Sequence, residues 1–485
     1  MAHHWVLEEL APRRPSRVSP EWGCGGVYGL HYTGDTLYYT VAFDAVAFFH
    51  SRGGGVERYD YRLLGPAPRS GGDTYNVSTS VDDEIYFGGW VHAPARLLGG
   101  EVDFSNKYSH VHAYSSSTGG VRLLWSESLH HPRLWAGEVT SLLYNPLRDS
   151  LLAARGDGHQ GLGVYELGRR GGARKASDTR VLRGTTYMDH ACFSLHHGWG
   201  GSPGVHCLDL ETMRGFTEAA GPEASVDGAP PPRYRSGDTA SAYTWLMVLA
   251  RGGLYRFDPF GGEPPAYVRL LDLGDAPYGP LRVNTLPVAG GLLAAFNAQS
   301  HSTIRGTEEL PRGQQRASRR PPAPSLLVYL SPPSARIVAA LGARTTSMEH
   351  LGCCVLLATS TCPNLERRDA TMVDHSVKTF EALPVEKVVT GTPPPVSIRI
   401  PGGRGALGGV PLEGYRRPLL RVRAPRRGAS LRLHLYRLDT GPGGADEDRV
   451  GLEPGWNTVD LGGHGGSIVS LEVDGGPWEA ELLLR

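Results

Sequence analysis

Several features that define common classes of protein are missing from this chain of 485 residues. Its apolar runs fall well short of the roughly 20 residues that span a bilayer, and its first residues carry neither the basic nor the apolar region of a signal peptide. We therefore expect a cytoplasmic protein with no membrane partner. The 49 basic and 49 acidic side chains give a formal net charge of zero. Without an overall field to collect nucleic acid, a nucleic-acid partner is not expected either.

Signature motifs of catalysis are also missing. The chain has no Walker loop, no GxSxG elbow, no HExxH and no dinucleotide fingerprint after a strand. These absences remove the common nucleotide-dependent and serine-hydrolase classes. The six cysteines form no CxxC pair, and most lie in apolar runs, where a thiol acts as a small hydrophobic group. We expect no sulfur-ligated metal. A disulfide that involves Cys353 or Cys354 is left as an alternative.

Long runs with helical periodicity are scarce, whereas short apolar runs separated by glycine and proline turns are abundant. This combination is typical of an all-β chain. Units of four such runs cover residues 26–64 and 137–183, with looser copies at 74–127, 185–219, 238–273, 281–341 and 345–390. A repeat of roughly 40–55 residues with four strands is the signature of propeller blades. We predict a β-propeller of about seven four-stranded blades over residues 1–392. The alternatives are six or eight blades, or a large sandwich or barrel.

The texture of the sequence changes at Pro393, the first of three consecutive prolines. From there to residue 485 the apolar residues alternate strictly with polar ones, which predicts a compact antiparallel β-sandwich, jelly-roll-like, as an accessory domain. Small sandwiches of this kind accompany many carbohydrate-active enzymes, which is an analogy only.

Acidic residues recur at one station of the repeat, directly before the inferred first strand of a unit. First strands of a propeller begin at one face, and the loops between second and third strands open onto that same face. The first-strand station holds Glu21 and Trp22, Asp73, Glu138, Asp189 and His190, Asp238, and Glu349 and His350. The loops add Trp90, His92, Asp157, His159 and His301. We expect these side chains to meet at the mouth of the central channel.

Carboxylates that converge repel one another unless they are neutralised, so they imply a cation, paired histidines or raised pKa values. In the functional interpretation a divalent metal ion is the cofactor, with ligands drawn from His92, His159, His190 and His301. Glu138 or Asp189 would be the catalytic acid or base. The predicted ligand-binding surface consists of Glu21, Trp22, Asp73, Trp90, Trp135, Glu349 and His350.

The structural interpretation of the same residues is that Asp and Glu cap turns and bond the backbone of a neighbouring blade. Histidine has no general role in capping turns, so the histidines favour function.

Seven segments carry a resemblance to a known family: SPEWGCGGVYGLHY (19–32), GGDTYN (71–76), YFGGWVHAP (86–94), NKYSHVH (106–112), HHPRLWAGEV (130–139), ARGDGHQGLGVY (154–165) and MDHACF (188–193). Together they resemble an archaeal family, a domain of unknown function with a predicted propeller fold. The resemblance covers about the first 390 residues and implies the fold and an archaeal source. It implies no activity and no catalytic residues.

The sequence thus predicts a propeller whose mouth binds a small molecule or a divalent metal. If the protein is an enzyme, metal-assisted hydrolysis or elimination on a carbohydrate-like substrate fits best. The alternative is a non-catalytic scaffold whose rim contacts proteins or ribonucleoproteins.

Overall fold

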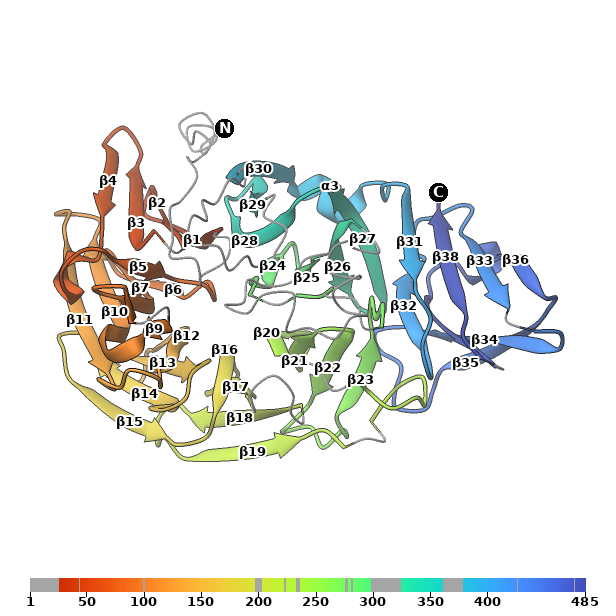
Figure 1. Ribbon diagram of the computed structural model, residues 1–485, viewed down its shortest axis with the longest axis horizontal. Helices are drawn as coiled ribbons and strands as arrows, with labels where there is room; N and C mark the ends of the chain where they lie inside the picture. Colours follow the sequence, from red (N-terminus) through yellow and green to blue (C-terminus); the bar gives the residue numbers. More distant parts are fainter. Residues whose placement is uncertain are drawn as a thin grey trace.

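The computed structural model places nearly every described residue in β-strands or in the turns between them (Figure 1). It describes residues 26–42, 44–98, 101–196, 203–221, 224–232, 236–274, 278–280, 282–297, 324–360, 378–424, 426–474 and 476–485. In these residues, seven antiparallel sheets follow one another around a ring, and two further sheets lie beside it. The predicted β-propeller with a C-terminal β-sandwich is confirmed.

The first four blades hold the first half of the chain. Blade one is formed by β1 (Val27–Thr33), β2 (Thr36–Val41), β3 (Val46–Ser51) and β4 (Gly55–Tyr59). Blade two is formed by β5 (Ser70–Gly72), β6 (Ser78–Val81), β7 (Glu84–His92), β10 (Lys107–Ser115) and β11 (Val121–Ser128), and carries the hairpin of β8 (Arg96–Leu98) and β9 (Glu101–Asp103). Blade three is formed by β12 (Glu138–Asn145), β13 (Ser150–Gly156), β14 (Gly163–Gly168) and β15 (Ala173–Ser177). Blade four is formed by β16 (Val181–Tyr187), β17 (His190–Leu195), β18 (Gly204–Asp209) and β19 (Gly215–Ala219).

Three more blades complete the ring. Blade five is formed by β20 (Ser236–Ala242), β21 (Trp245–Ala250), β22 (Gly253–Phe257) and β23 (Ala266–Arg269). Blade six is formed by β24 (Leu286–Val288), β25 (Gly291–Phe296), β26 (Ser325–Ser331) and β27 (Ser334–Leu341). Blade seven is formed by β28 (Arg344–His350), β29 (Cys354–Ser360) and β30 (Lys378–Pro384), followed by α3 (Val385–Thr390). Blade seven closes on blade one, where the amide of Leu30 donates to Ser347 Oγ at 3.0 Å.

Burial follows the position of a strand within its blade. The second strands β2, β13 and β25 are buried at every residue, because the neighbouring blades cover both faces of a blade. This explains why they read as unbroken apolar runs. The outer strands β4 and β15 are largely exposed and more polar. In blade four, Cys192 of β17 and Cys207 of β18 form a disulfide, whereas Cys353 and Cys354 are free thiols.

Two sheets form the sandwich. One runs in the order β31 (Val396–Ile400), β38 (Glu479–Leu484), β33 (Leu419–Ala424) and β36 (Gly455–Asp460). The other runs in the order β32 (Leu407–Pro411), β37 (Ile468–Val473), β34 (Ala429–Tyr436) and β35 (Asp446–Leu452). In β31 every second residue is buried, as the alternation predicts for a sheet with one covered face. The domain boundary between residues 392 and 393 stays a prediction.

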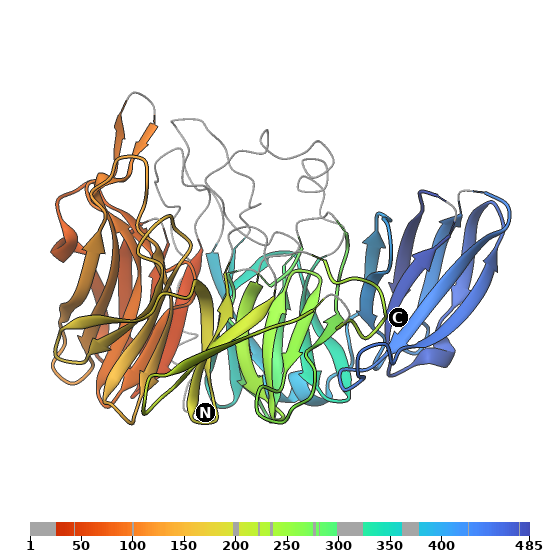
Figure 2. The same ribbon diagram turned by 90° about the horizontal axis from the view of Figure 1, so that it is seen from below.

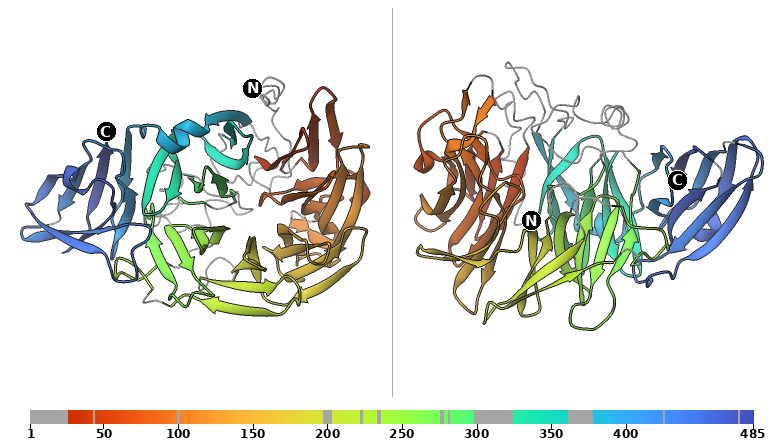
Figure 3. Two further views of the ribbon diagram at one scale, coloured as in Figure 1. Left: turned by 180° about the vertical axis from the view of Figure 1, so that it is seen from behind. Right: turned by 60° about the horizontal axis from the view of Figure 1, so that its bottom comes forward.

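The sandwich packs against blades five and six (Figures 2 and 3). One continuous apolar core contains residues of β21, β23 and β26 together with residues of both sandwich sheets. The backbone of residues 271–272 is hydrogen-bonded to that of residues 408–409. Within this junction the Arg269 guanidinium is bound by Asp227 at 2.7 Å and by Asp272 at 2.6 Å, and all three side chains are buried.

In the described residues, no helix is long and apolar enough to cross a membrane.

Candidate functional site at the mouth of the propeller

First strands of the blades all run from one face of the ring to the other. We call the face where they begin the mouth face and the opposite one the far face. Glu138 is the first residue of β12, and Asp157 and His159 follow the end of β13. Trp90 and His92 lie at the end of β7. These residues therefore share the mouth face, as the sequence predicts.

Asp189 and His190 do not join them. The sequence reading places both residues before the first strand of blade four, and this is wrong, because β16 (Val181–Tyr187) is the first strand. Asp189 lies in the β16–β17 turn and His190 begins β17, both on the far face. The sequence does not indicate β16 as a strand because its middle is polar. Arg183 and its neighbours face the propeller axis instead of an apolar layer.

Glu349 and His350 are also on the far face, since they end β28 rather than precede it. Burial raises the pKa of Glu349 to about 8, and its Oε2 lies 3.8 Å from His31 Nδ1 of blade one. The prediction that this pair lines the mouth is wrong. Glu21, Trp22 and His301 lie outside the described residues.

Asp73 has a structural role at the centre of the ring. The innermost strand of blade two is interrupted between β5 and β6, and residues 73–77, which we call the axial segment, turn inward there. Asp73 accepts hydrogen bonds from the amides of Tyr75, at 2.7 Å, and Val77. Its burial raises its pKa to about 7. The carboxylate thus caps a turn, as the structural interpretation predicts for this station.

The axial segment contacts first strands on several sides of the ring. Asn76 Oδ1 accepts from the Gly29 amide of blade one, and Asn76 Nδ2 donates to the carbonyl of Thr346 in blade seven. Arg183 of blade four donates to the carbonyls of Tyr75 and Asn76 and to Asp238 of blade five. A segment that reaches blades one, four and seven at once must lie on the propeller axis.

Four charged side chains from blades two, three and six meet beside this segment. Glu138 accepts from the amide and the hydroxyl of Thr74 at 3.1 and 2.5 Å. Arg282, which precedes β24, donates to Thr74 Oγ1 at 2.9 Å and to Asp157 at 2.8 Å. Lys107, the first residue of β10, is the fourth member. We call Lys107, Glu138, Asp157 and Arg282 the mouth cluster.

Burial moves two pKa values of the mouth cluster toward neutrality. Burial raises the pKa of Glu138 to about 7; Arg282 opposes the rise and Asp157 adds to it. Burial also lowers the pKa of Lys107 to about 8, against the pull of the Glu138 and Asp157 carboxylates. An acid and an amine that both titrate near pH 7 are suited to exchanging protons with a bound molecule.

The Lys107 side chain is only 5% exposed and lies between two indole rings. Its ammonium nitrogen is 4.9 Å from the ring centre of Trp90 and 5.4 Å from that of Trp135. The Lys107 ammonium makes no hydrogen bond or ion pair with any residue that the structure describes. An ammonium with little access to water is costly without acceptors, so this nitrogen is an unsatisfied charge at the mouth.

Aromatic and imidazole rings form one wall of the cluster. The ring centres of Trp135 and His159 are 4.0 Å apart, and the Trp135 amide donates to His159 Nδ1 at 3.4 Å. Phe104 lies between this pair and His92. Its ring centre is 5.0 Å from that of Trp135 and 6.1 Å from that of His92. Burial lowers the pKa of His92 to about 4 and also lowers that of His159, which favours the uncharged form of both rings.

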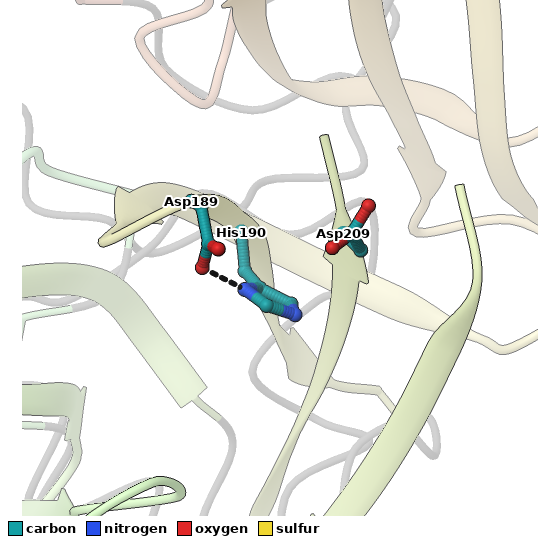
Figure 4. Close-up of side chains that lie close together, drawn as sticks. All are labelled: Asp189, His190 and Asp209. Atoms are coloured by element: carbon teal, nitrogen blue, oxygen red, sulfur yellow. Dashed lines mark hydrogen bonds and ion pairs between the residues drawn. The ribbon is translucent and has the colours of Figure 1, made fainter. Parts of the chain in front are cut away.

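The predicted metal set of His92, His159, His190 and His301 does not come together, because His190 is on the far face and His301 is outside the described residues. Among the described residues, one group of three His, Cys, Asp or Glu side chains has metal-ligand spacing: Asp189, His190 and Asp209 (Figure 4).

Sequence reasoning missed Lys107 and Arg282. A signal for Lys107 existed, since the chain has only four lysines and this one lies in the segment NKYSHVH. No local signal marks Arg282, whose partners Asp157 and Thr74 are 125 and 208 residues away.

Solved structures of several kinds are similar to this chain in fold. Virginiamycin B lyase from Staphylococcus aureus is 10% identical with a TM-score of 0.43, and the match covers 76% of this chain and 99% of that one. The β-propeller domain of the Trilobed protease from Pyrococcus furiosus is 10% identical with a TM-score of 0.38, over 75% and 96% of the two chains. An exo-β-1,3-galactanase from Phanerochaete chrysosporium is 9% identical with a TM-score of 0.28, over 84% and 95%.

A comparison with curated protein sequences found no match. A family match covers residues 37–368, which is more than half of the chain and spans β2 to β29. That family is described as "uncharacterized protein conserved in archaea" (DUF2139). The chain, whose own fold is a ring of antiparallel blades, therefore belongs to that archaeal family.

Proposed function

We propose that the mouth cluster binds a small polar ligand, carbohydrate-like in its hydroxyl and carboxyl oxygens, and performs acid–base chemistry on it. The observation that carries this proposal is the Lys107 ammonium, which is buried without a hydrogen bond or an ion pair among the described residues. An oxygen of a ligand would supply the missing acceptor. Trp90 and Trp135 flank the same nitrogen and would offer apolar ring faces to a sugar.

Glu138 is the group best suited to move a proton. Thr74 occupies Oε1 with two hydrogen bonds, whereas no described residue donates to Oε2. With a pKa of about 7 the carboxyl can give or accept a proton near neutral pH. Lys107, with a pKa of about 8, would stabilise negative charge that develops on the substrate. Hydrolysis or elimination at a glycosidic bond both fit these two roles.

A non-catalytic scaffold is the second candidate, and the axial segment favours it. Hydrogen bonds from blades one, four and seven fix this segment on the axis, so the centre of the ring is filled by protein. Propellers that serve as platforms for proteins do not need an open channel.

Binding and turnover separate the two candidates. The full chain is screened by thermal shift against neutral and uronic-acid oligosaccharides. Active mixtures are then assayed for new reducing ends, which report hydrolysis, and for the ultraviolet absorbance of an unsaturated sugar, which reports elimination. We expect Lys107→Met to lose binding and Glu138→Gln to keep binding but lose turnover by at least about 100-fold.

Asp189→Asn on the far face is the matched control for both variants and should bind oligosaccharides and turn them over as the wild type does. If no oligosaccharide shifts the melting temperature of the wild type, or if Lys107→Met binds as the wild type does, the proposal fails and the scaffold is favoured.

A further inference from the structure

Asp189, His190 and Asp209 form a separate side-chain cluster on the far face of blade four (Figure 4). Asp189 lies in the β16–β17 turn, His190 is the first residue of β17, and Asp209 is the last residue of β18. One ligand atom of each side chain lies within 4.8 Å of the other two. Donors bonded to one ion at about 2.0–2.2 Å lie at most about 4.4 Å apart, so a small side-chain adjustment brings a donor of His190 and one of Asp209 onto one ion.

The His190 ring is oriented by its surroundings. Nδ1 lies 2.6 Å from Asp189 Oδ1, which makes Nδ1 the protonated nitrogen and leaves the lone pair on Nε2. Phe216 and Phe260 pack against the ring, with centres 5.8 and 4.8 Å away, and the side chain is only 13% exposed. Figure 4 shows the second ring nitrogen on the side away from Asp189.

Nε2 of His190 has no hydrogen bond to any described residue. A histidine that binds a metal through one nitrogen characteristically donates the other N–H to a carboxylate, which fixes the tautomer and makes the ligand more basic. The Asp189–His190 pair has this arrangement, on a ring that aromatic packing holds in place.

Asp209 supplies an oxygen on the other side. Its Oδ1 accepts from the amides of Glu211 and Thr212, at 3.1 and 2.6 Å, and from the Thr212 hydroxyl. These bonds hold the carboxylate rigidly, while Oδ2 accepts no hydrogen bond from described residues. Hydrogen bonds from the amide and the hydroxyl of Thr212 lower the pKa of this carboxyl, which favours its charged form.

We propose that His190 and Asp209, with Asp189 as the carboxylate behind the imidazole, bind one divalent transition-metal ion on the far face. One imidazole and carboxylate oxygens are donors that suit Zn²⁺ or Mn²⁺. The exposed side chains of Met188 and Phe260 flank the cluster, so water or an external donor completes the coordination from the solvent side. This site is independent of the mouth cluster.

The test is a titration of the metal-free full chain with ZnCl₂ and, separately, MnCl₂ by isothermal titration calorimetry. His190→Gln, which keeps much of the packing volume, should bind one ion fewer than the wild type. Asp209→Asn should weaken the same site at least tenfold. Asp189→Asn should weaken it by about 10- to 100-fold through the imidazole. Circular dichroism and melting temperature without metal check that each variant folds.

His464→Ala is the matched control, because His464 faces a single carboxylate, Asp448, at 3.6 Å. This variant should bind as many ions as the wild type. The proposal is overturned if His190→Gln and the wild type bind equal numbers of ions with equal affinity, or if the wild type takes up no ion. Loss of one ion in His464→Ala but not in His190→Gln would also overturn it.

Discussion

The propeller–sandwich junction and the mouth both bury charged side chains, but the two regions differ in how completely these charges are paired. At the junction, Arg269 is bound by Asp227 and Asp272 at 2.7 and 2.6 Å, and the carbonyls of residues 229 and 230 take further guanidinium hydrogens. At the mouth, Arg282 is paired with Asp157, but among the described residues the Lys107 ammonium has no acceptor and Glu138 accepts hydrogen bonds at only one oxygen.

The difference separates two purposes of buried charge. A buried network that satisfies every member fixes how two parts pack together. A buried network with unsatisfied members costs stability, and such groups with pKa values shifted toward neutrality gather at functional sites. The junction is a satisfied network and the mouth is an unsatisfied one. Mutations of charged residues should therefore lower stability at the junction and affect ligand binding at the mouth.

The largest effect is expected from Arg269→Met. It leaves the carboxylates of Asp227 and Asp272 buried side by side, which should lower the free energy of unfolding by about 3–5 kcal/mol. Denaturant unfolding measures this. Arg399→Met removes an exposed ion pair with Glu479 and should change it by less than about 1 kcal/mol. Equal effects of the two substitutions would contradict a structural role for the junction network.

The second-largest loss in the free energy of unfolding is expected from Gly409→Ala. A Cβ at this position, where φ is +63°, would lie 2.4 Å from the carbonyl oxygen of Arg269, so the backbones of sandwich and blade five would have to separate. We expect a loss of about 2–4 kcal/mol and faster proteolysis between the two parts. Gly428→Ala has a similar φ of +75° but no neighbour within 4 Å, so it should cost only about 1 kcal/mol. A comparable loss in both variants would show that the conformation, not the contact, matters.

Lys107→Met, unlike the two preceding substitutions, should not lower the free energy of unfolding. Removing an ammonium that has no partner in the described part of the chain leaves Glu138 able to protonate, so the free energy of unfolding should stay within about 1 kcal/mol of the wild type or rise. Thermal and denaturant unfolding give the value. A loss of several kcal/mol would place Lys107 among the structural charges, together with Arg269.

The smallest effect is a change in pH dependence. Glu138 has a pKa raised from 4.5 to about 7, so its contribution to stability is fully present below about pH 4.5 and is lost as the pH rises through 7. Lys107, lowered from 10.5 to about 8, contributes above 10.5 and loses that contribution as the pH falls through 8. Glu138→Gln should therefore flatten the fall of the melting temperature between pH 5 and 7, by roughly a few degrees. Parallel curves for both proteins would rule out this titration.

Much of the fold could be predicted because blades repeat a local pattern. Second strands such as β13 are buried on both faces and appear as apolar runs, and sandwich strands such as β31 alternate. The pattern failed for β16, whose Arg183, Thr185 and Thr186 face the axis or solvent, and that failure displaced Asp189 and His190 to the wrong face.

The site could be predicted only in part. Glu138, Asp157 and His159 were placed on the correct face because a strand end or a loop marks each of them. Their partners could not be, since Arg282 reaches Asp157 only through closure of the whole ring. The structural interpretation describes Asp73 correctly as a turn cap, because a buried carboxylate beside three amides satisfies local backbone groups first.

The axial segment also bears on how the molecule assembles. Its Asn76 bonds to residues 47, 206 and 270 positions away along the chain, so its partners are complete only after blade seven has formed. In linear repeat arrays each unit depends on its neighbours alone and can unfold from an end. Here one asparagine ties early and late blades together. We expect the ring to gain and lose its structure as one cooperative unit, with no stable half-ring along the way.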